Sequence, residues 1–250
     1  MQTFEKQLKA TWQEIMENYN NAAAIAVQPL WDDHEEVGFT NYPNLRYETA
    51  STVKVAVLTL LLHTTGGCLD QAQQDLASRM ICNSDNKATT TILENYLGGM
   101  LALTAVYHGL KMNNTTASTW WGTTLTVPHD QLKLLRLIYQ QTDNDYLTDQ
   151  SRRYIRHLMA NINYQQQWGI SAGSPRFFLK NGWRRASDNQ KWEVHSIGYI
   201  PNGYHSYLIA IYTRNNRNFN SGVSYVEKLA KATRQILEKG EWDRTSLPSS

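Results

Sequence analysis

The sequence predicts an α+β fold: an antiparallel sheet of five strands from both chain ends, flanked by terminal helices, with an inserted all-helical lobe. The order of the expected elements along the chain leads to this prediction. Along the 250 residues, a helix and strands come first, then a long helical block, then three strands and a last helix. One sheet shared by both ends of the chain accounts for that order. We expect one domain over 1–240, with a sheet lobe at about 1–47 and 175–240 and a helical lobe at about 48–174.

The N-terminal segment changes from helical to strand periodicity. A helix is predicted over about 3–18, because apolar residues recur there at helical spacing. These residues are Phe4, Leu8, Trp12, Ile15 and Met16. Residues 22–30 and 36–40 are predicted strands joined by a turn at 31–34, and 41–46 is a loop that leads to Ser51.

Helical patterns dominate the middle of the chain. An apolar helix that begins near Ser51 should end at Gly66-Gly67. Further helices are expected over 70–80, 85–97, 100–110, from Pro128 onward, and over 147–159. The polar stretch 111–127 is longer than most connections, which indicates a functional loop.

Strand patterns return after a loop at 169–175. The predicted strands are 176–183, 192–200 and 206–214, with tight turns at 188–189 and 202–203. A last helix is expected over 223–237, and the tail 241–250 is expected to be disordered.

Composition excludes several classes of function. The net charge is only +2 and the basic residues are scattered, so nucleic-acid binding has no support. No apolar run is long enough to span a membrane. The first residues lack a signal segment, so we expect a cytoplasmic protein, unless a leader was removed from an exported form.

Metal and cofactor sites are not expected either. The seven histidines never pair at ligand spacing, and Cys68 and Cys82 have no metal-site spacing. Free thiols in a reducing compartment are the favoured interpretation of the two cysteines, although a single bridge remains open.

The strongest candidate for chemistry is Ser51 with Lys54, ahead of an apolar run from Val55 to Leu62. Their spacing places both side chains on one helical face, one turn apart. Burial lowers the pKa of a lysine, and a neutral amine can take the proton of a serine hydroxyl. The structural alternative is that Ser51 only caps the helix while Lys54 reaches solvent.

The pattern Ser-x-x-Lys is short enough to occur about once by chance in a chain of this length. Ser84 and Lys87 form a second copy. Polar residues follow Lys87, so we expect it to stay solvated and charged, and Ser51 is therefore the predicted nucleophile.

Three motifs occur in order: Ser51-x-x-Lys54, Ser84-Asp85-Asn86 and Lys180-Asn181-Gly182. With them the chain resembles the penicillin-recognising serine enzymes, whose signature set is Ser-x-x-Lys, Ser-Asp-Asn and Lys-Thr-Gly. It looks most like the class A β-lactamase-like group, up to about residue 238. The resemblance implies the same two-lobed fold, a serine hydrolase that forms an acyl-enzyme, and a site at the seam of the lobes.

The resemblance also implies roles for individual residues. Ser51 would be the acylated nucleophile, Lys54 its base, and Ser84 a relay that passes a proton to the leaving group. The implied substrate-binding residues are Asn86, Lys180, Asn181, Gly182 and Trp183. Lys180 would attract a substrate carboxylate, and the backbone N–H groups of Ser51 and Trp183 would form an oxyanion hole. For Asp85 we expect a helix-capping role.

The chain departs from the family pattern at several points. Asn181 stands where Thr or Ser is usual, and its amide could still donate to a substrate carboxylate. Trp183 is bulky and could narrow the cleft, and the interval from Ser51 to Ser84 is short. Most importantly, no Asp or Glu occurs between Glu94 and Asp130, where class A enzymes carry the Glu that activates the deacylating water. We therefore expect weak deacylation.

Three further features have open interpretations. Trp120-Trp121 could form a substrate wall or simply pack. Arg152-Arg153 and Arg184-Arg185 are most simply solvated, although Arg184 or Arg185 could meet an anionic substrate.

The expected substrate is a small molecule: a β-lactam, an ester or a D-Ala peptide. A D,D-peptidase or a small esterase would use the same chemistry, and a sensor or scaffold that acylates once or never is the alternative of another class. The sequence does not predict an oligomeric state.

Overall fold

The computed structural model describes residues 3–140 and 145–239, and the tail 241–250 lies outside these residues. Its centre is a five-stranded antiparallel sheet in the order β2-β1-β7-β6-β5. The strands are β1 Ala22–Pro29, β2 Val37–Thr40, β5 Phe178–Arg185, β6 Trp192–Ile200 and β7 Tyr207–Asn216. The predicted sheet, built from both ends of the chain, is confirmed.

Both faces of the sheet are buried, which explains why its central strands are almost continuously apolar. Alternate residues of β1 point to opposite faces: Ala24 and Ala26 lie in the core of the helical lobe, whereas Ile25 and Val27 lie in the core beneath the terminal helices. The same alternation runs along β7.

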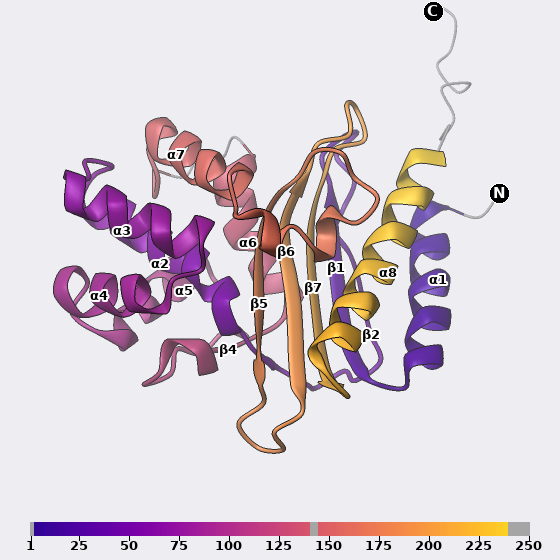
Figure 1. Cartoon of the computed structure of the whole chain (residues 1–250). Coiled ribbons are helices and arrows are strands. Elements are labelled where there is room, and N and C mark those ends of the chain that lie inside the picture. Colours follow the sequence, from indigo (N-terminus) through magenta and orange to yellow (C-terminus); the bar gives the residue numbers. More distant parts are fainter. Residues whose placement is uncertain (1–2, 141–144, 240–250) are drawn as a thin grey trace, which may run out of the picture.

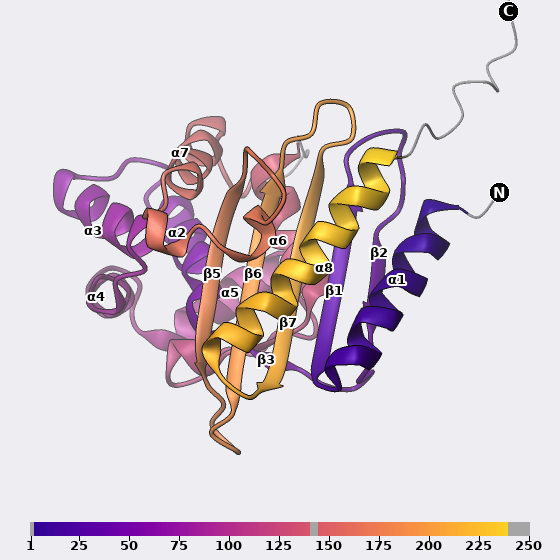
Figure 2. The same ribbon diagram turned by 45° about the vertical axis from the view of Figure 1, so that its right-hand side comes forward.

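The terminal helices α1 Phe4–Tyr19 and α8 Phe219–Lys239 cover one face of the sheet side by side (Figures 1 and 2). Trp12 of α1 is fully buried and donates its indole N–H to Thr233 of α8 at 2.9 Å. The last helix begins four residues before the predicted start, and the first matches its prediction to within a residue.

The helical lobe covers the opposite face (Figure 1). Its helices are α2 Lys54–Thr64, α3 Gln71–Cys82, α4 Asn86–Tyr96, α5 Leu103–Gly109, α6 Pro128–Tyr139 and α7 Asp149–Ala160. Helix α2 is at its centre, because every residue from Lys54 to Leu62 is buried. The insertion of an all-helical region between the two parts of the sheet is confirmed.

One small element was not predicted. Strands β3 Tyr47–Glu48 and β4 Leu125–Thr126 pair antiparallel as a two-stranded ribbon. The backbone N–H of Thr49 extends this pairing by donating to Thr124 O at 2.8 Å. The polar loop 111–127 is thereby fastened to the segment that leads into Ser51.

Candidate active site

Ser51 lies in a short 3-10 turn, η1 Ala50–Val53, and the α-helix begins only at Lys54. The structural alternative, in which Ser51 only caps an α-helix, is therefore wrong: its hydroxyl makes no capping hydrogen bond. The preceding Ala50 has a φ of 46°, in the left-handed region that non-glycine residues seldom adopt. The chain thus bends sharply at the residue before Ser51.

Lys54 is fully buried, and its amine lies at the centre of the site. Its Nζ lies 3.0 Å from Ser51 Oγ, 2.7 Å from Ser84 O, 3.1 Å from Ser84 Oγ and 2.8 Å from Asn86 Oδ1. The structural alternative, a lysine that reaches solvent, is excluded by this burial.

Burial lowers the pKa of Lys54 to about 6, and the nearby charge of Lys180 acts in the same direction. A neutral amine has two N–H donors and one lone pair. Ser84 O and Asn86 Oδ1 can only accept, so they take the two N–H groups. The lone pair is then left for a hydroxyl, and Ser51 Oγ at 3.0 Å is in range.

Ser84 connects the two lysines of the site. Its Oγ lies 3.0 Å from Lys180 Nζ, which also donates to the carbonyl of Asn181 at 3.1 Å. Lys180 comes from β5 and is almost fully buried, and burial lowers its pKa to about 7. Ser51, Lys54, Ser84 and Lys180 therefore converge where the helical lobe meets the sheet.

The second Ser-x-x-Lys copy is a different arrangement. Lys87 is exposed, whereas Lys54 is buried. Asp85 caps helix α4 by accepting the backbone N–H of Ala88, which confirms the role expected for it.

Gly182 lets β5 pack directly against the turn that carries Ser51. A Cβ at this position would lie 2.8 Å from Thr49 O and 2.9 Å from both Ser51 N and Thr52 N. Real Cβ atoms do not approach the backbone so closely, so only glycine fits here.

Asn181 and Trp183 do not point into the cleft, because side chains alternate along β5. The amide of Asn181 donates to Gln166 O at 2.7 Å and to Trp168 O at 3.0 Å. Both of its N–H groups are thus used, and the expected contact with a substrate carboxylate is not supported. Trp183 packs on Trp168 and Phe219 beside α8, so the expectation that it narrows the cleft is wrong.

The loop 111–127, which contains no Asp or Glu, places Trp121 beside the amine of Lys54. Trp121 is buried, and Lys54 Nζ lies 5.0 Å from the centroid of its ring. Trp120 stacks on Trp121 at 4.9 Å between ring centroids and remains 47% exposed. Asp130, the acid that follows the loop, is fully buried and accepts from Asn114 N and the Thr115 hydroxyl, so it holds the loop in place.

Two arginines expected to be solvated are not. Arg184 Nη1 forms an ion pair with Glu48 Oε2 at 2.8 Å, and its guanidinium lies over the ring of Trp120. Arg152 is buried, donates to Leu137 O and pairs with Asp149. Glu48 could not be identified as the partner of Arg184 from the sequence, because the two residues meet only in the tertiary fold. Asp149 could have been, because it lies three residues before Arg152 on a predicted helix.

The sequence analysis also missed His195 and Tyr212, which lie under the Ser51 turn. His195 Nε2 is 2.9 Å from Glu48 O, and Tyr212 OH is 2.7 Å from Thr52 Oγ1. Polar residues at alternate positions of an apolar strand, Glu193 and His195 of β6, are the signal that could have pointed to His195.

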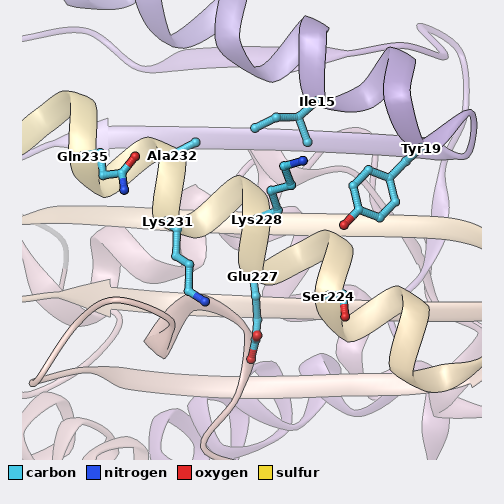
Figure 3. A pocket seen from close by; sticks show the side chains of 8 residues that line it. All are labelled: Ile15, Tyr19, Ser224, Glu227, Lys228, Lys231, Ala232 and Gln235. Carbon is cyan, nitrogen blue, oxygen red and sulfur yellow. The ribbon is translucent and has the colours of Figure 1, made fainter.

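An open groove of about 460 Å³ lies elsewhere, on the outer surface between α1 and α8 (Figure 3). Lys228 points across it toward Ile15 and Tyr19. The groove is lined only by residues of these two helices, which cover the face of the sheet opposite the site, and it shares no residue with the site.

Both cysteines, Cys68 and Cys82, carry free thiols. Within residues 3–140 and 145–239, no cluster of three or more His, Cys, Asp or Glu side chains is arranged to hold a metal ion. In the same part of the chain, no helix combines the length and apolar character needed to cross a membrane.

A family model described as the beta-lactamase enzyme family matches residues 70–237, more than half of the chain. The matched range contains Ser84 and Lys180 and begins after Ser51 and Lys54. No curated protein matches the sequence significantly.

Solved structures share the fold at low sequence identity. A class A beta-lactamase from Bacteroides cellulosilyticus has a TM-score of 0.81 at 14% identity, with 95% of this chain and 99% of that chain covered. A beta-lactamase from Xanthomonas campestris has a TM-score of 0.76 at 18% identity, covering 94% and 99%. A variant of PBP-A, as an acyl-enzyme complex with penicillin G, has a TM-score of 0.77 at 20% identity, covering 93% and 97%.

Proposed function

Because the chain belongs to the beta-lactamase enzyme family, we propose that it is a serine hydrolase that forms an acyl-enzyme at Ser51. The observation that carries this proposal is the buried amine of Lys54, 3.0 Å from Ser51 Oγ, with its pKa lowered to about 6. At neutral pH such an amine is largely unprotonated, which a general base requires. Lys54 is the base in this proposal.

In the acylation step, Ser51 Oγ attacks the carbonyl carbon of an amide or ester, and its proton moves to Lys54 Nζ. The resulting oxyanion would be held by the backbone N–H groups of Ser51 and Trp183. The close approach of Gly182 to Ser51 N supports this placement. Collapse of the intermediate breaks the bond to the leaving group, which receives the proton of Lys54 through Ser84 Oγ, 3.1 Å from Nζ.

The substrate we propose is a small amide or ester that carries a carboxylate, as a β-lactam does. Lys180 supplies the positive potential for that carboxylate when protonated, and Asn86 is exposed beside the amine, where it can also meet a substrate amide. One structure with this fold is an acyl-enzyme complex with penicillin G, which supports the proposal by analogy. A D,D-peptidase or a small esterase would use the same residues.

In this proposal, release of the acyl group from Ser51 is the slow step of the reaction. The loop that faces Lys54 contributes the indole of Trp121, and Asp130 is occupied in holding the loop. Lys54 itself must then activate water. This observation favours slow release, and a protein that is acylated once and acts as a sensor is its limiting case.

Intact-mass measurement with a fluorophosphonate, nitrocefin and nitrophenyl esters tests the proposal. With the fluorophosphonate and with nitrocefin we expect one covalent equivalent, mapped to the peptide that contains Ser51 and absent from Ser51→Ala, whereas nitrophenyl esters should turn over. Ser84→Ala should still be labelled, at a lower rate. Labelling that survives Ser51→Ala but disappears in Ser84→Ala would reverse the assignment, and a wild-type protein that no probe modifies would refute the function.

A further inference from the structure

Three residues on neighbouring strands form a row beneath the Ser51 turn. Gly182 of β5 is the cross-strand partner of His195 of β6, and His195 is the partner of Tyr212 of β7. All three lie on the face of the sheet that meets the helical lobe. We call Gly182, His195 and Tyr212 the seat row.

The seat row contacts successive residues of the segment 48–52. His195 Nε2 lies 2.9 Å from Glu48 O, and Tyr212 OH lies 2.7 Å from Thr52 Oγ1. Gly182 leaves room for the backbone of Thr49 and Ser51. Each residue of the row therefore fixes a different point of the turn, on either side of Ser51.

Within this row, the ring of His195 is held in one orientation. It is fully buried, and its Nδ1 accepts the backbone N–H of Thr213 at 3.3 Å. The hydrogen of the neutral ring is then on Nε2, which donates to Glu48 O. The rings of Tyr212, at 4.4 Å between centroids, and Tyr47, at 6.3 Å, enclose it.

Ion pairs lie on both sides of the same junction. The carboxylate of Glu48 pairs with Arg184, which follows Gly182 on the same face of β5. The buried carboxylate of Glu193 lies 3.2 Å from Arg214 Nε and 3.6 Å from His195 Nε2. The Glu48–Arg184 pair joins the segment before Ser51 to β5, and the Glu193–Arg214 pair joins β6 to β7.

We propose that His195 is a positioning residue for Ser51, acting through its hydrogen bond to the carbonyl of Glu48, three residues before the nucleophile. This proposal rests on the proposed function, because it takes Ser51 as the nucleophile. His195 contacts neither Ser51 Oγ nor Lys54 Nζ. Its hydrogen bond to Glu48 O fixes the distance between the Ser51 turn and the sheet. A displacement of about 1 Å at a reacting atom can cost about a hundredfold in rate, so the effect should be measurable.

Replacement of His195 by Leu and by Gln tests the proposal, because Leu removes the donor and Gln keeps an N–H within similar reach. We expect His195→Leu to slow acylation by a fluorophosphonate about ten- to a hundredfold, and His195→Gln to restore most of that rate. The pH at the midpoint of the acylation profile should not change, since His195 is not the base. For a nitrophenyl ester the loss should appear in kcat/KM, which reports acylation, and kcat should change less because it reports the slower release of the acyl group.

The control is Thr233→Val, which removes a buried hydrogen bond to Trp12 on the other side of the sheet. It should lower Tm and leave the acylation rate unchanged. If His195→Leu does not fold, Tyr212→Phe removes the neighbouring contact to Thr52 and should slow acylation to a smaller extent. Wild-type acylation rates in folded His195→Leu, equal losses in the Leu and Gln variants, or a similar loss in Thr233→Val would each overturn the proposal.

A crystal structure of His195→Leu gives a result that does not depend on activity. We expect Ser51 to move relative to Lys54 and Gly182, and an unchanged turn would overturn the positioning role. Failure of the wild-type protein to react with any probe would instead refute the proposed function, so the two failures can be distinguished.

Discussion

The partners of the Lys54 amine leave its lone pair for the Ser51 hydroxyl, which lies 3.0 Å away. Ser84 O and Asn86 Oδ1 hold the two N–H groups of the neutral amine. Ser84 Oγ is shared with Lys180 at 3.0 Å. The two lysines are therefore linked through one hydroxyl, and the charge of Lys180 also lowers the pKa of Lys54.

The pKa values of Lys54 and Lys180 predict that the pH profile of kcat/KM depends on the charge of the substrate. With a neutral ester, kcat/KM should rise as pH passes through about 6, because Lys54 must lose its proton to act as base. With a carboxylate-bearing substrate, a falling limb should follow near pH 7, because Lys180 then loses the charge that attracts the carboxylate. Stopped-flow or steady-state rates across this range give the two profiles. A rate for the neutral ester that is flat between about pH 5 and 8 would contradict the role of Lys54.

The contact between β5 and the Ser51 turn governs the site at the scale of secondary-structure elements. Gly182→Ala would place a methyl group 2.8–2.9 Å from three backbone atoms, so β5 and the turn must separate. We expect acylation to fall about a hundredfold and stability to fall by about 1–3 kcal/mol. Gly38→Ala on β2 is the matched control, since its nearest contact would be 3.7 Å away. Similar acylation rates in the two variants would show that the close packing at Gly182 is not needed.

The loop that carries Trp121 predicts how long the acyl group stays. Loss of a positioned general base typically costs about a hundred- to ten-thousand-fold in rate. A β-lactam keeps its leaving group tethered in the cleft, so its adduct should persist for minutes or longer by mass spectrometry. Nitrophenyl esters release their alcohol and should turn over through Lys54. Efficient steady-state hydrolysis of penicillins without a trapped intermediate would show that water is activated by another route.

The sequence predicted the elements well, because they depend on local pattern, and the pairing of Ser51 with Lys54 follows from their spacing. That Ser84 and Lys180 join them was implied only by the resemblance of the three motifs to a known family. The sequence analysis missed β3 and β4, since two residues per strand carry no periodicity. The orientation of Asn181 and Trp183 was available from the alternation along β5 and was not used. The partners of Arg184 and His195 were not available, because Glu48 and these residues meet only after the sheet and the turn have packed.

At the scale of the whole molecule, the two buried lysines make stability depend on pH. The pKa of each is lower in the folded chain than in the unfolded chain, so between about pH 7 and 10 the unfolded state binds more protons. Stability therefore rises with pH in that window. In Lys54→Met this slope should be smaller than in the wild type by about 1 kcal/mol per pH unit, measured by denaturant unfolding at several pH values. Lys87→Met, at an exposed lysine, is the control, and an unchanged slope in Lys54→Met would mean that Lys54 is not neutral when folded.

The pairing of β1 with β7 has a consequence for the protein during its synthesis. Ala22 of β1 pairs with Arg214 of β7. Strand β1 lies between β2 and β7 in the sheet, so it can pair with β7 only after almost the whole chain has been synthesised. Contacts between distant segments form late, whereas helices close on their near neighbours quickly. On the ribosome, the helical segments with Ser51 and Ser84 emerge first, and Lys180 on β5 emerges well after them. We therefore expect the nascent chain to carry Ser51 without the complete candidate site, which forms only after β5 has joined the sheet.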